Sequence, residues 1–211
     1  QGEPNKQKTA KTYTVNATNQ IIENNTFDFT LSKEDEMRFF SAHYDDFLGD
    51  ENKELVLIST SPAQGMKFYI WEEKEPQIFK SLGPPHIIYE TNNPTNPKES
   101  IVVSEKDNRH KKIAIVFGSP NRKITLFEVK EDTVLQNNIA EEKLNNQAGT
   151  IIFKSFYNET KEQETLYILN NGQTKTLTQV LAQKNEEPEE KFNINKPVKD
   201  FFVLNQQNKI F

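Results

Sequence analysis

The sequence predicts an all-β protein of short antiparallel strands. Short continuous runs of β-branched and aromatic residues recur along the chain, and each precedes a cluster of turn-forming residues and a strand-like alternating run. The apolar content of 34% is low for a soluble domain, but 15 Phe and 6 Tyr occur in clusters. We therefore expect a thin core of aromatic and branched side chains, joined by long polar connections.

One unit, an apolar run followed by a turn and an alternating run, occurs four times. The units begin at Leu55, Ile113, Leu166 and Phe201. Repeats that each form a small antiparallel sheet are typical of β-propeller blades. The sequence thus predicts a partial or degenerate β-propeller of about four blade-like units. Because the spacing of the units is unequal, a β-sandwich with unequal loops is the alternative.

The polar composition of residues 1–20 predicts a flexible tail or an edge strand, and residues 21–211 are expected to form the propeller-like domain. Four units are too few to close an ordinary ring, so this domain is expected to be incomplete. Within it, residues 42–80 should form one contiguous antiparallel meander, because apolar runs there are separated only by turn-rich links. The side chains expected to be buried in the meander are Leu55, Leu57, Phe68 and Ile70.

Charge and composition exclude several classes of protein. A net charge of −5 and a pI near 5.4 argue against a nucleic-acid-binding protein, which would present a basic face. The basic cluster at residues 109–112 directly precedes an apolar run and is interpreted as a solvated turn. The chain has no cysteine, which excludes disulfides and thiolate metal sites. No apolar stretch approaches the roughly 18 residues of a transmembrane helix, so no membrane span is predicted.

An acidic segment, Asp46-Phe47-Leu48-Gly49-Asp50-Glu51-Asn52-Lys53-Glu54, stands just before the first apolar run. Acidic side chains fall at its first, fifth and ninth positions, and Gly49 can adopt the positive φ of a tight loop. Hard cations such as Ca²⁺ require several carboxylate and carbonyl oxygens that converge from such a loop. Asp46, Asp50 and Glu54 are therefore the candidate metal ligands, and Ca²⁺ is the candidate cofactor.

This segment resembles the FG-GAP repeats of integrin-α-type propellers, in which Asp-Phe-Asp-Gly-Asp-Gly-x-x-Asp-Leu precedes a buried strand. Downstream, residues 55–60 and 68–73 resemble a blade of the T-cell immunomodulatory protein family, whose ectodomain carries FG-GAP repeats. The resemblance covers about residues 42–80, and the other three units share only the order of runs and turns. It implies a cell-surface or secretory-pathway module that binds other proteins.

The segment departs from the FG-GAP pattern at two ligand positions. Leu48 stands where Asp or Asn is usual, and Glu54 stands in place of Asp. Loss of one carboxylate is expected to weaken Ca²⁺ affinity greatly. The alternative interpretation is that Gly49 and the acidic residues form a polar turn that keeps the shape of the loop without a metal.

No catalytic residue is predicted. His43 could act as a base beside Asp45 and Asp46, but these residues lie within four positions of one another and no nucleophile motif accompanies them. His86 and His110 are interpreted as ordinary packed or surface residues. The 7 glycines form no phosphate-binding motif. The chain is therefore expected not to be an enzyme.

The expected function is a non-catalytic interaction or scaffold module in an ectodomain or a multi-subunit assembly. Its expected partners are other protein chains, because an open array of blades leaves apolar surface in water. The residues of the open C-terminal unit that would meet a partner are Phe201, Phe202, Ile210 and Phe211. The alternative function is a secreted carbohydrate-binding or hydrolytic β-protein, which a cleft lined by Tyr69, Trp71 and a pair of carboxylates would favour.

Three N-glycosylation sequons agree with an extracellular glycoprotein. They begin at Asn16, Asn24 and Asn158, and each has Thr two residues further on.

Overall fold

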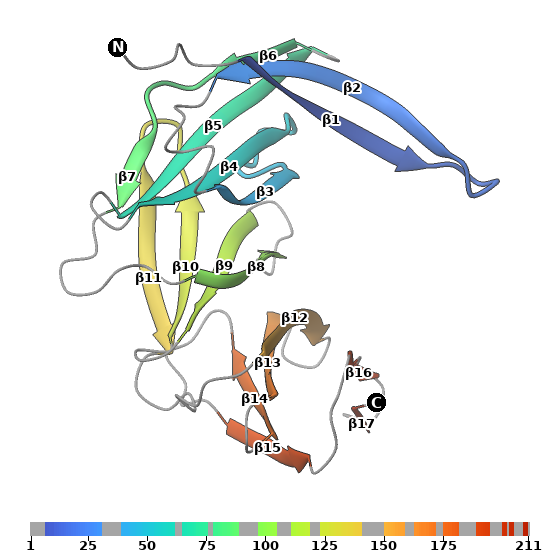
Figure 1. The fold of residues 1–211 in the computed structure, drawn as a ribbon, viewed down its shortest axis with the longest axis vertical. Helices are drawn as coiled ribbons and strands as arrows, with labels where there is room; N and C mark the ends of the chain where they lie inside the picture. Colours follow the sequence, from blue (N-terminus) through green and yellow to red (C-terminus); the bar gives the residue numbers. More distant parts are fainter. Residues whose placement is uncertain are drawn as a thin grey trace. The chain divides into compact units, whose positions relative to one another are not determined.

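The computed structural model describes the following residues: 7–30, 39–61, 65–75, 78–88, 97–104, 111–118, 123–140, 150–158, 163–171, 175–181, 189–194, 200–201, 203–204 and 209–210. They form β-strands joined by turns and short connections (Figure 1). No described residue belongs to a helix that is long and apolar enough to cross a membrane.

The strands, in chain order, are β1 (Gln7–Val15), β2 (Ile21–Thr30), β3 (Phe39–Asp45), β4 (Glu54–Ser61), β5 (Gly65–Glu75), β6 (Ile78–Ser81), β7 (His86–Ile88), β8 (Pro97–Ser104), β9 (Lys111–Phe117), β10 (Ile124–Val129), β11 (Val134–Ala140), β12 (Thr150–Asn158), β13 (Gln163–Asn171), β14 (Lys175–Leu181), β15 (Glu189–Ile194), β16 (Val203–Leu204) and β17 (Lys209–Ile210).

Strands that follow one another in the sequence also lie next to one another in the sheets. The larger sheets have the orders β3-β4-β5-β6, β8-β9-β10-β11 and β12-β13-β14-β15, and β7 also pairs with β5. The pairs β1-β2 and β16-β17 form two-stranded sheets. All these pairings are antiparallel, and none of the described sheets closes on itself. The all-β class predicted from the sequence is therefore confirmed.

The chain divides into two compact units. The first comprises residues 1–45 and 51–95, and the second comprises residues 46–50 and 96–211. In the first unit, residues 7–15 of the predicted tail or edge strand form β1, which pairs with β2 along its whole length.

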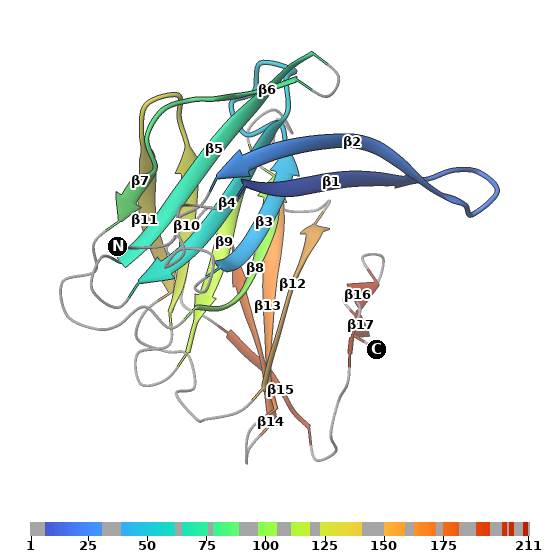
Figure 2. The ribbon, with the colours of Figure 1, turned by 45° about the horizontal axis from the view of Figure 1, so that its top comes forward.

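The meander predicted for residues 42–80 is confirmed. In the first unit, β3, β4 and β5 lie side by side, and β4 pairs with both neighbours (Figure 2). The apolar run of β4 places Leu55 and Leu57 on one face and Val56 and Ile58 on the other, because successive side chains of a strand alternate. All four predicted core side chains are buried, with exposed fractions of 5% for Leu55, 3% for Leu57, 0% for Phe68 and 4% for Ile70.

In the second unit, the middle strands bury side chains on both faces of their sheets. Every residue from Ile113 to Phe117 of β9 is buried, as are Ile124 to Phe127 of β10 and Leu166 to Leu169 of β13. Antiparallel sheets with one solvated face show an alternating burial pattern instead. At β9, β10 and β13 these sheets are therefore covered on both sides, which explains the continuous apolar runs of β9 and β13.

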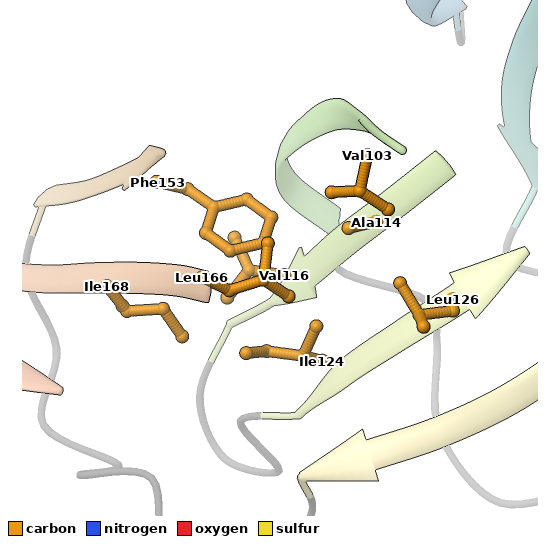
Figure 3. Packing of buried hydrophobic residues seen from close by; sticks show 8 residues of the cluster. All are labelled: Val103, Ala114, Val116, Ile124, Leu126, Phe153, Leu166 and Ile168. Atoms are coloured by element: carbon orange, nitrogen blue, oxygen red, sulfur yellow. The ribbon is translucent and has the colours of Figure 1, made fainter. Parts of the chain in front are cut away.

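The two larger sheets of the second unit pack face to face. Figure 3 shows side chains of β8, β9 and β10 pointing toward side chains of β12 and β13. The buried members of this inter-sheet core are Val103, Ala114, Val116, Ile124, Leu126, Phe153, Leu166 and Ile168. When twisted sheets pack face to face, such side chains interdigitate, and the two faces that meet are removed from water.

Two carboxylates each reach from one of these sheets to a backbone N–H on an edge strand of the other. Glu99 Oε2, on β8, accepts a hydrogen bond of 2.8 Å from the backbone N–H of Phe153 on β12. Glu164 Oε1, on β13, accepts one of 3.0 Å from the backbone N–H of Ser104 on β8. Edge strands leave backbone donors unpaired, so these carboxylates satisfy donors that no neighbouring strand reaches. Burial raises the pKa of the Glu99 carboxyl, and the Phe153 N–H opposes this effect.

Phe201 packs on the other face of the sheet that contains β13. It is 5% exposed and forms a cluster with Tyr167 and Leu169. Its ring meets the Tyr167 ring nearly edge-on, with centroids 6.4 Å apart. Phe201 therefore covers part of the second face of this sheet, over β13.

We predict that Leu166→Ala lowers the free energy of unfolding by about 2–5 kcal/mol, because it leaves a cavity in the inter-sheet core at a residue with no exposed surface. Urea unfolding followed by circular dichroism measures the change. Leu135→Ala is the matched control, since Leu135 on β11 is 49% exposed and should cost less than about 1 kcal/mol. Equal losses in the two variants would contradict the described core.

Candidate functional site

The acidic segment predicted as a metal loop joins β3 to β4. Asp46 Oδ1 accepts a hydrogen bond of 2.7 Å from the backbone N–H of Gly49. Gly49 has the positive φ expected from the sequence (74°), and Glu51 also has one (73°). The Phe47 side chain is buried, at 1% exposed. The Asp46 contact is of the kind by which Asp side chains close tight turns.

Glu54 lies in a row of acidic residues across the first sheet. It is the first residue of β4, and its register partners are Asp45 on β3 and Glu72 on β5. Glu54 and Glu72 are buried, at 0% and 4% exposed. Glu72 Oε1 accepts a hydrogen bond of 3.2 Å from Asn52 Nδ2 and forms an ion pair with Lys74. An amide and an ammonium group thus compensate a buried carboxylate, as burial of charge requires.

The three candidate metal ligands are not assembled into a ligand group. Among the described residues, no group of three or more His, Cys, Asp or Glu side chains is arranged to hold a metal ion. Ca²⁺ prefers six to eight oxygen ligands, which a single carboxylate or pair does not supply. Ca²⁺ binding by Asp46, Asp50 and Glu54 stays a prediction. The alternative interpretation, a polar turn without a metal, requires a contact such as the Asp46–Gly49 hydrogen bond.

One face of the first sheet carries a group of aromatic side chains, which we call the aromatic face. Its partly buried members, packed over the buried Leu55 and Leu57, are Tyr44, Tyr69, Trp71 and Phe79. They come from β3, β5 and β6, and the strand register places Tyr44 and Trp71 on either side of Leu55. The aromatic face therefore depends on the register with which the consecutive strands β3 to β6 pair.

The rings of the aromatic face are oriented by contacts with one another and with charged groups. The Tyr69 and Trp71 rings are nearly parallel, at 10°, with centroids 5.9 Å apart. The Tyr44 hydroxyl donates a hydrogen bond to Glu73, and Lys53 Nζ lies 5.2 Å from the centroid of the Tyr44 ring. Aromatic rings fixed in this way present a large contact area at little cost in conformational entropy.

The sequence singled out Tyr69 and Trp71 but not Tyr44 or Phe79. Period-two alternation in β5 indicates that Tyr69 and Trp71 share a face. The register that brings Tyr44 and Phe79 onto the same face is set by the loops and by the pairing of β3 and β6, which the alternation does not reveal.

His43 lies on β3, opposite Val56 of β4. Burial lowers the pKa of its imidazole to about 4, so the ring is neutral at physiological pH. His86 is the first residue of β7 and pairs with Phe68. His110 lies outside the described residues.

We predict that His43 makes the protein less stable in acid. The folded-state pKa, about 4, is below the ordinary value of 6.5, so the unfolded chain binds the proton first. Stability is fully present above about pH 6.5 and falls between pH 6.5 and pH 4, by at most about 3 kcal/mol. Urea unfolding at pH 4, 5, 6 and 8 measures this fall. His43→Gln has no ring to titrate, and an unchanged pH slope in this variant would contradict the assignment.

We also predict that Asp46→Ala destabilises the protein by about 1 kcal/mol in the presence of a chelator, because it removes the acceptor of the Gly49 N–H. Asp132→Ala, at an exposed turn, is the control.

Thermal unfolding with and without millimolar Ca²⁺ separates the two interpretations of the loop. If Asp46, Asp50 and Glu54 bind Ca²⁺, the ion raises the Tm of the unmodified chain and Asp50→Asn abolishes the rise. If the loop is a polar turn, Ca²⁺ leaves the Tm unchanged.

No family model, curated protein or solved structure matches the chain.

Proposed function

We propose that this chain is a non-catalytic protein-interaction module, built as a stack of FG-GAP-like propeller blades, in an ectodomain or a multi-subunit assembly. The observation that carries the proposal is the burial of both faces of successive antiparallel meanders. The secretory or extracellular location rests on the resemblance of residues 42–80 to FG-GAP repeats and on the sequons.

Burial on both faces favours a stack of blades over a β-sandwich. A sandwich has two layers, and each of its sheets buries one face while the other meets water. In the second unit, Leu166 and Ile168 of β13 enter the inter-sheet core, whereas Tyr167 and Leu169 pack with Phe201 on the opposite face. This sheet is thus covered by a second sheet on one face and by Phe201 on the other, and its strands follow the sequence order. Propeller blades have both of these properties.

The aromatic face supports a role in binding other proteins. Tyr and Trp are enriched in the centres of protein interfaces, where they combine large apolar area with few rotatable bonds. Trp71 and Tyr69 are partly exposed, whereas the residues beneath them, Leu55 and Leu57, are buried. We expect the partner to present an apolar sheet face, because sheet faces of that kind pack against each other inside the second unit.

We also propose a partner at the C-terminal unit, on a smaller surface than the sequence predicted. Phe201 is already buried against Tyr167 and Phe156 inside the second unit. The partner would therefore meet the β16-β17 pair itself rather than Phe201. Phe202 and Phe211 lie outside the described residues, as does the side chain of Ile210.

A secreted carbohydrate-binding protein is the second candidate, and the near-parallel Tyr69 and Trp71 rings favour it. Partly exposed rings can stack on the apolar face of a sugar, and Glu73 lies two residues beyond Trp71 on the same strand face. The Glu73 carboxylate, however, already accepts a hydrogen bond from Tyr44. This arrangement supports binding of a sugar more than its hydrolysis.

We predict that the purified chain self-associates through the aromatic face. Trp71 is the only tryptophan, so its emission should shift to shorter wavelength as the concentration rises, and sedimentation should show species larger than the monomer. Tyr69→Ser with Trp71→Ser should weaken the association at least tenfold, which corresponds to about 1.4 kcal/mol. Ile78→Ser, at a side chain that is 54% exposed on β6, is the control.

A compact monomer at every concentration, with cooperative unfolding, would contradict the interaction module. Addition of oligosaccharides tests the second candidate in the same experiment. A saturable change in Trp71 emission, lost in Tyr69→Ser, would favour carbohydrate binding over protein binding.

A further inference from the structure

The turn between β1 and β2 is organised around one side-chain oxygen. Asn16 Oδ1 accepts hydrogen bonds from the backbone N–H of Thr18 (3.0 Å), the hydroxyl of Thr18 (2.8 Å) and the backbone N–H of Gln20 (2.9 Å). The backbone closes the same turn, because Asn16 N–H donates to the Gln20 carbonyl at 3.0 Å. Asn19 has a positive φ of 60°, which Asn tolerates better than most residues. Asn16 and Thr18 are also the first and third residues of a sequon.

These contacts fix which way the Asn16 amide points. Two backbone N–H groups are directed at the same atom, and only an oxygen can accept from both. Nδ2 must therefore be the other atom, and it donates to Gln20 Oε1 at 3.2 Å. An amide nitrogen carries two hydrogens, and the turn uses one of them. Replacement of the second hydrogen by a substituent leaves every one of these hydrogen bonds intact.

The surroundings of the turn offer space for a large substituent. Residues 17–20 are exposed, and Asn16 is partly exposed. The adjoining strands expose apolar side chains, with Tyr13 53%, Ile21 74% and Ile22 44% exposed. Exposed apolar residues on a two-stranded ribbon invite pairing with other chains. A bulky, hydrated group at Asn16 would shield them, which is one physical effect of a glycan.

The other two sequons lie in strands. Asn24 is within β2 at the register shift, where the pairing with β1 passes from Asn25 to Glu23 and gives Asn24 no partner. Asn158 is the last residue of β12 and pairs with Gln163, and its Thr160 lies outside the described residues. A substituent on Asn158 would have to avoid its cross-strand neighbour. Asn16 differs from both of the other sequon residues in lying at an exposed hairpin turn rather than within a strand.

We propose that Asn16 is the glycosylated asparagine of this chain, with a polyprenyl-pyrophosphate-linked oligosaccharide as the sugar donor. Asn16 Nδ2 forms a bond to the anomeric carbon of the first sugar, and the bond from that carbon to the pyrophosphate oxygen breaks. Nδ2 loses one proton, and the polyprenyl pyrophosphate leaves with the bonding electrons, so no oxidant or reductant is needed. The proposal rests on the secretory location included in the proposed function.

The test is site mapping of the chain isolated from its native source and of the full chain secreted from eukaryotic cells. Peptide N-glycosidase converts a glycosylated Asn to Asp, and mass spectrometry locates the converted residue. We expect conversion at residue 16 in most molecules, retained in Thr18→Ser and lost in Thr18→Ala and Asn16→Gln. Asn24→Gln and Asn158→Gln should leave the conversion at residue 16 unchanged.

Self-association of the chain with and without the glycan provides a second readout. A glycan that does not shield the exposed apolar side chains would leave self-association unchanged. Enzymatic removal of the glycan should increase self-association, and Ile21→Gln with Ile22→Gln, which creates no new sequon, should suppress that increase, because both positions are exposed on β2.

The possible failures are distinguishable. Conversion only at residue 24 or 158 would overturn the assignment of Asn16 and leave the secretory location standing. A native chain without any N-linked glycan, recovered from the cytosol, would overturn both the site and the secretory part of the proposed function.

Discussion

The fold depends on one constraint, which is that the strands β4, β9 and β13, each in the interior of its sheet, are apolar on both sides. A strand such as β9, in which Ile113 to Phe117 are all buried, cannot leave either face in water. At roughly 25 cal/mol per Å² of apolar surface, exposure of one sheet face would cost many kcal/mol in a domain of marginal stability. The sheets must therefore be covered twice. In the second unit, β13 meets this requirement by packing toward Phe153 and β9 on one face and toward Phe201 on the other.

Stacked sheets create a secondary requirement at their edges. The strands β8 and β12 begin their respective sheets, so part of their backbone has no ladder partner. Glu99 and Glu164 supply the missing acceptors to Phe153 and Ser104 across the interface between the sheets. Carboxylates are strong acceptors of backbone N–H groups, and each of these two also fixes the relative placement of two sheets. The apolar core supplies most of the stabilisation, and the two glutamates supply directional contacts.

Several polar side chains have structural roles in the described residues. The Asp46 carboxylate closes a turn, the Glu72 carboxylate is held by Asn52 and Lys74, and the His43 imidazole is kept neutral by burial. The surfaces on which the proposals rest are the aromatic face of β3 to β6 and the exposed β1-β2 hairpin. In the proposed interaction module, the first would supply aromatic contact area and the second would carry the proposed modification.

The sequence by itself determined the all-β class and the positions of β4, β9 and β13, because a continuous run of β-branched and aromatic residues between turn residues has few alternatives to a buried strand. It also located the turn at Gly49, whose positive φ is a local property, and the sequon at Asn16. The first strand of each larger sheet, β3, β8 or β12, is less apolar than the strand that follows it. The structure was needed to establish how each of these first strands pairs with the next strand. Only the tertiary structure joined Tyr44 and Phe79 to Trp71 and aligned Asp45, Glu54 and Glu72. These groupings depend on hydrogen bonds and packing between segments that are separate in the chain, and local propensity carries no information about such contacts.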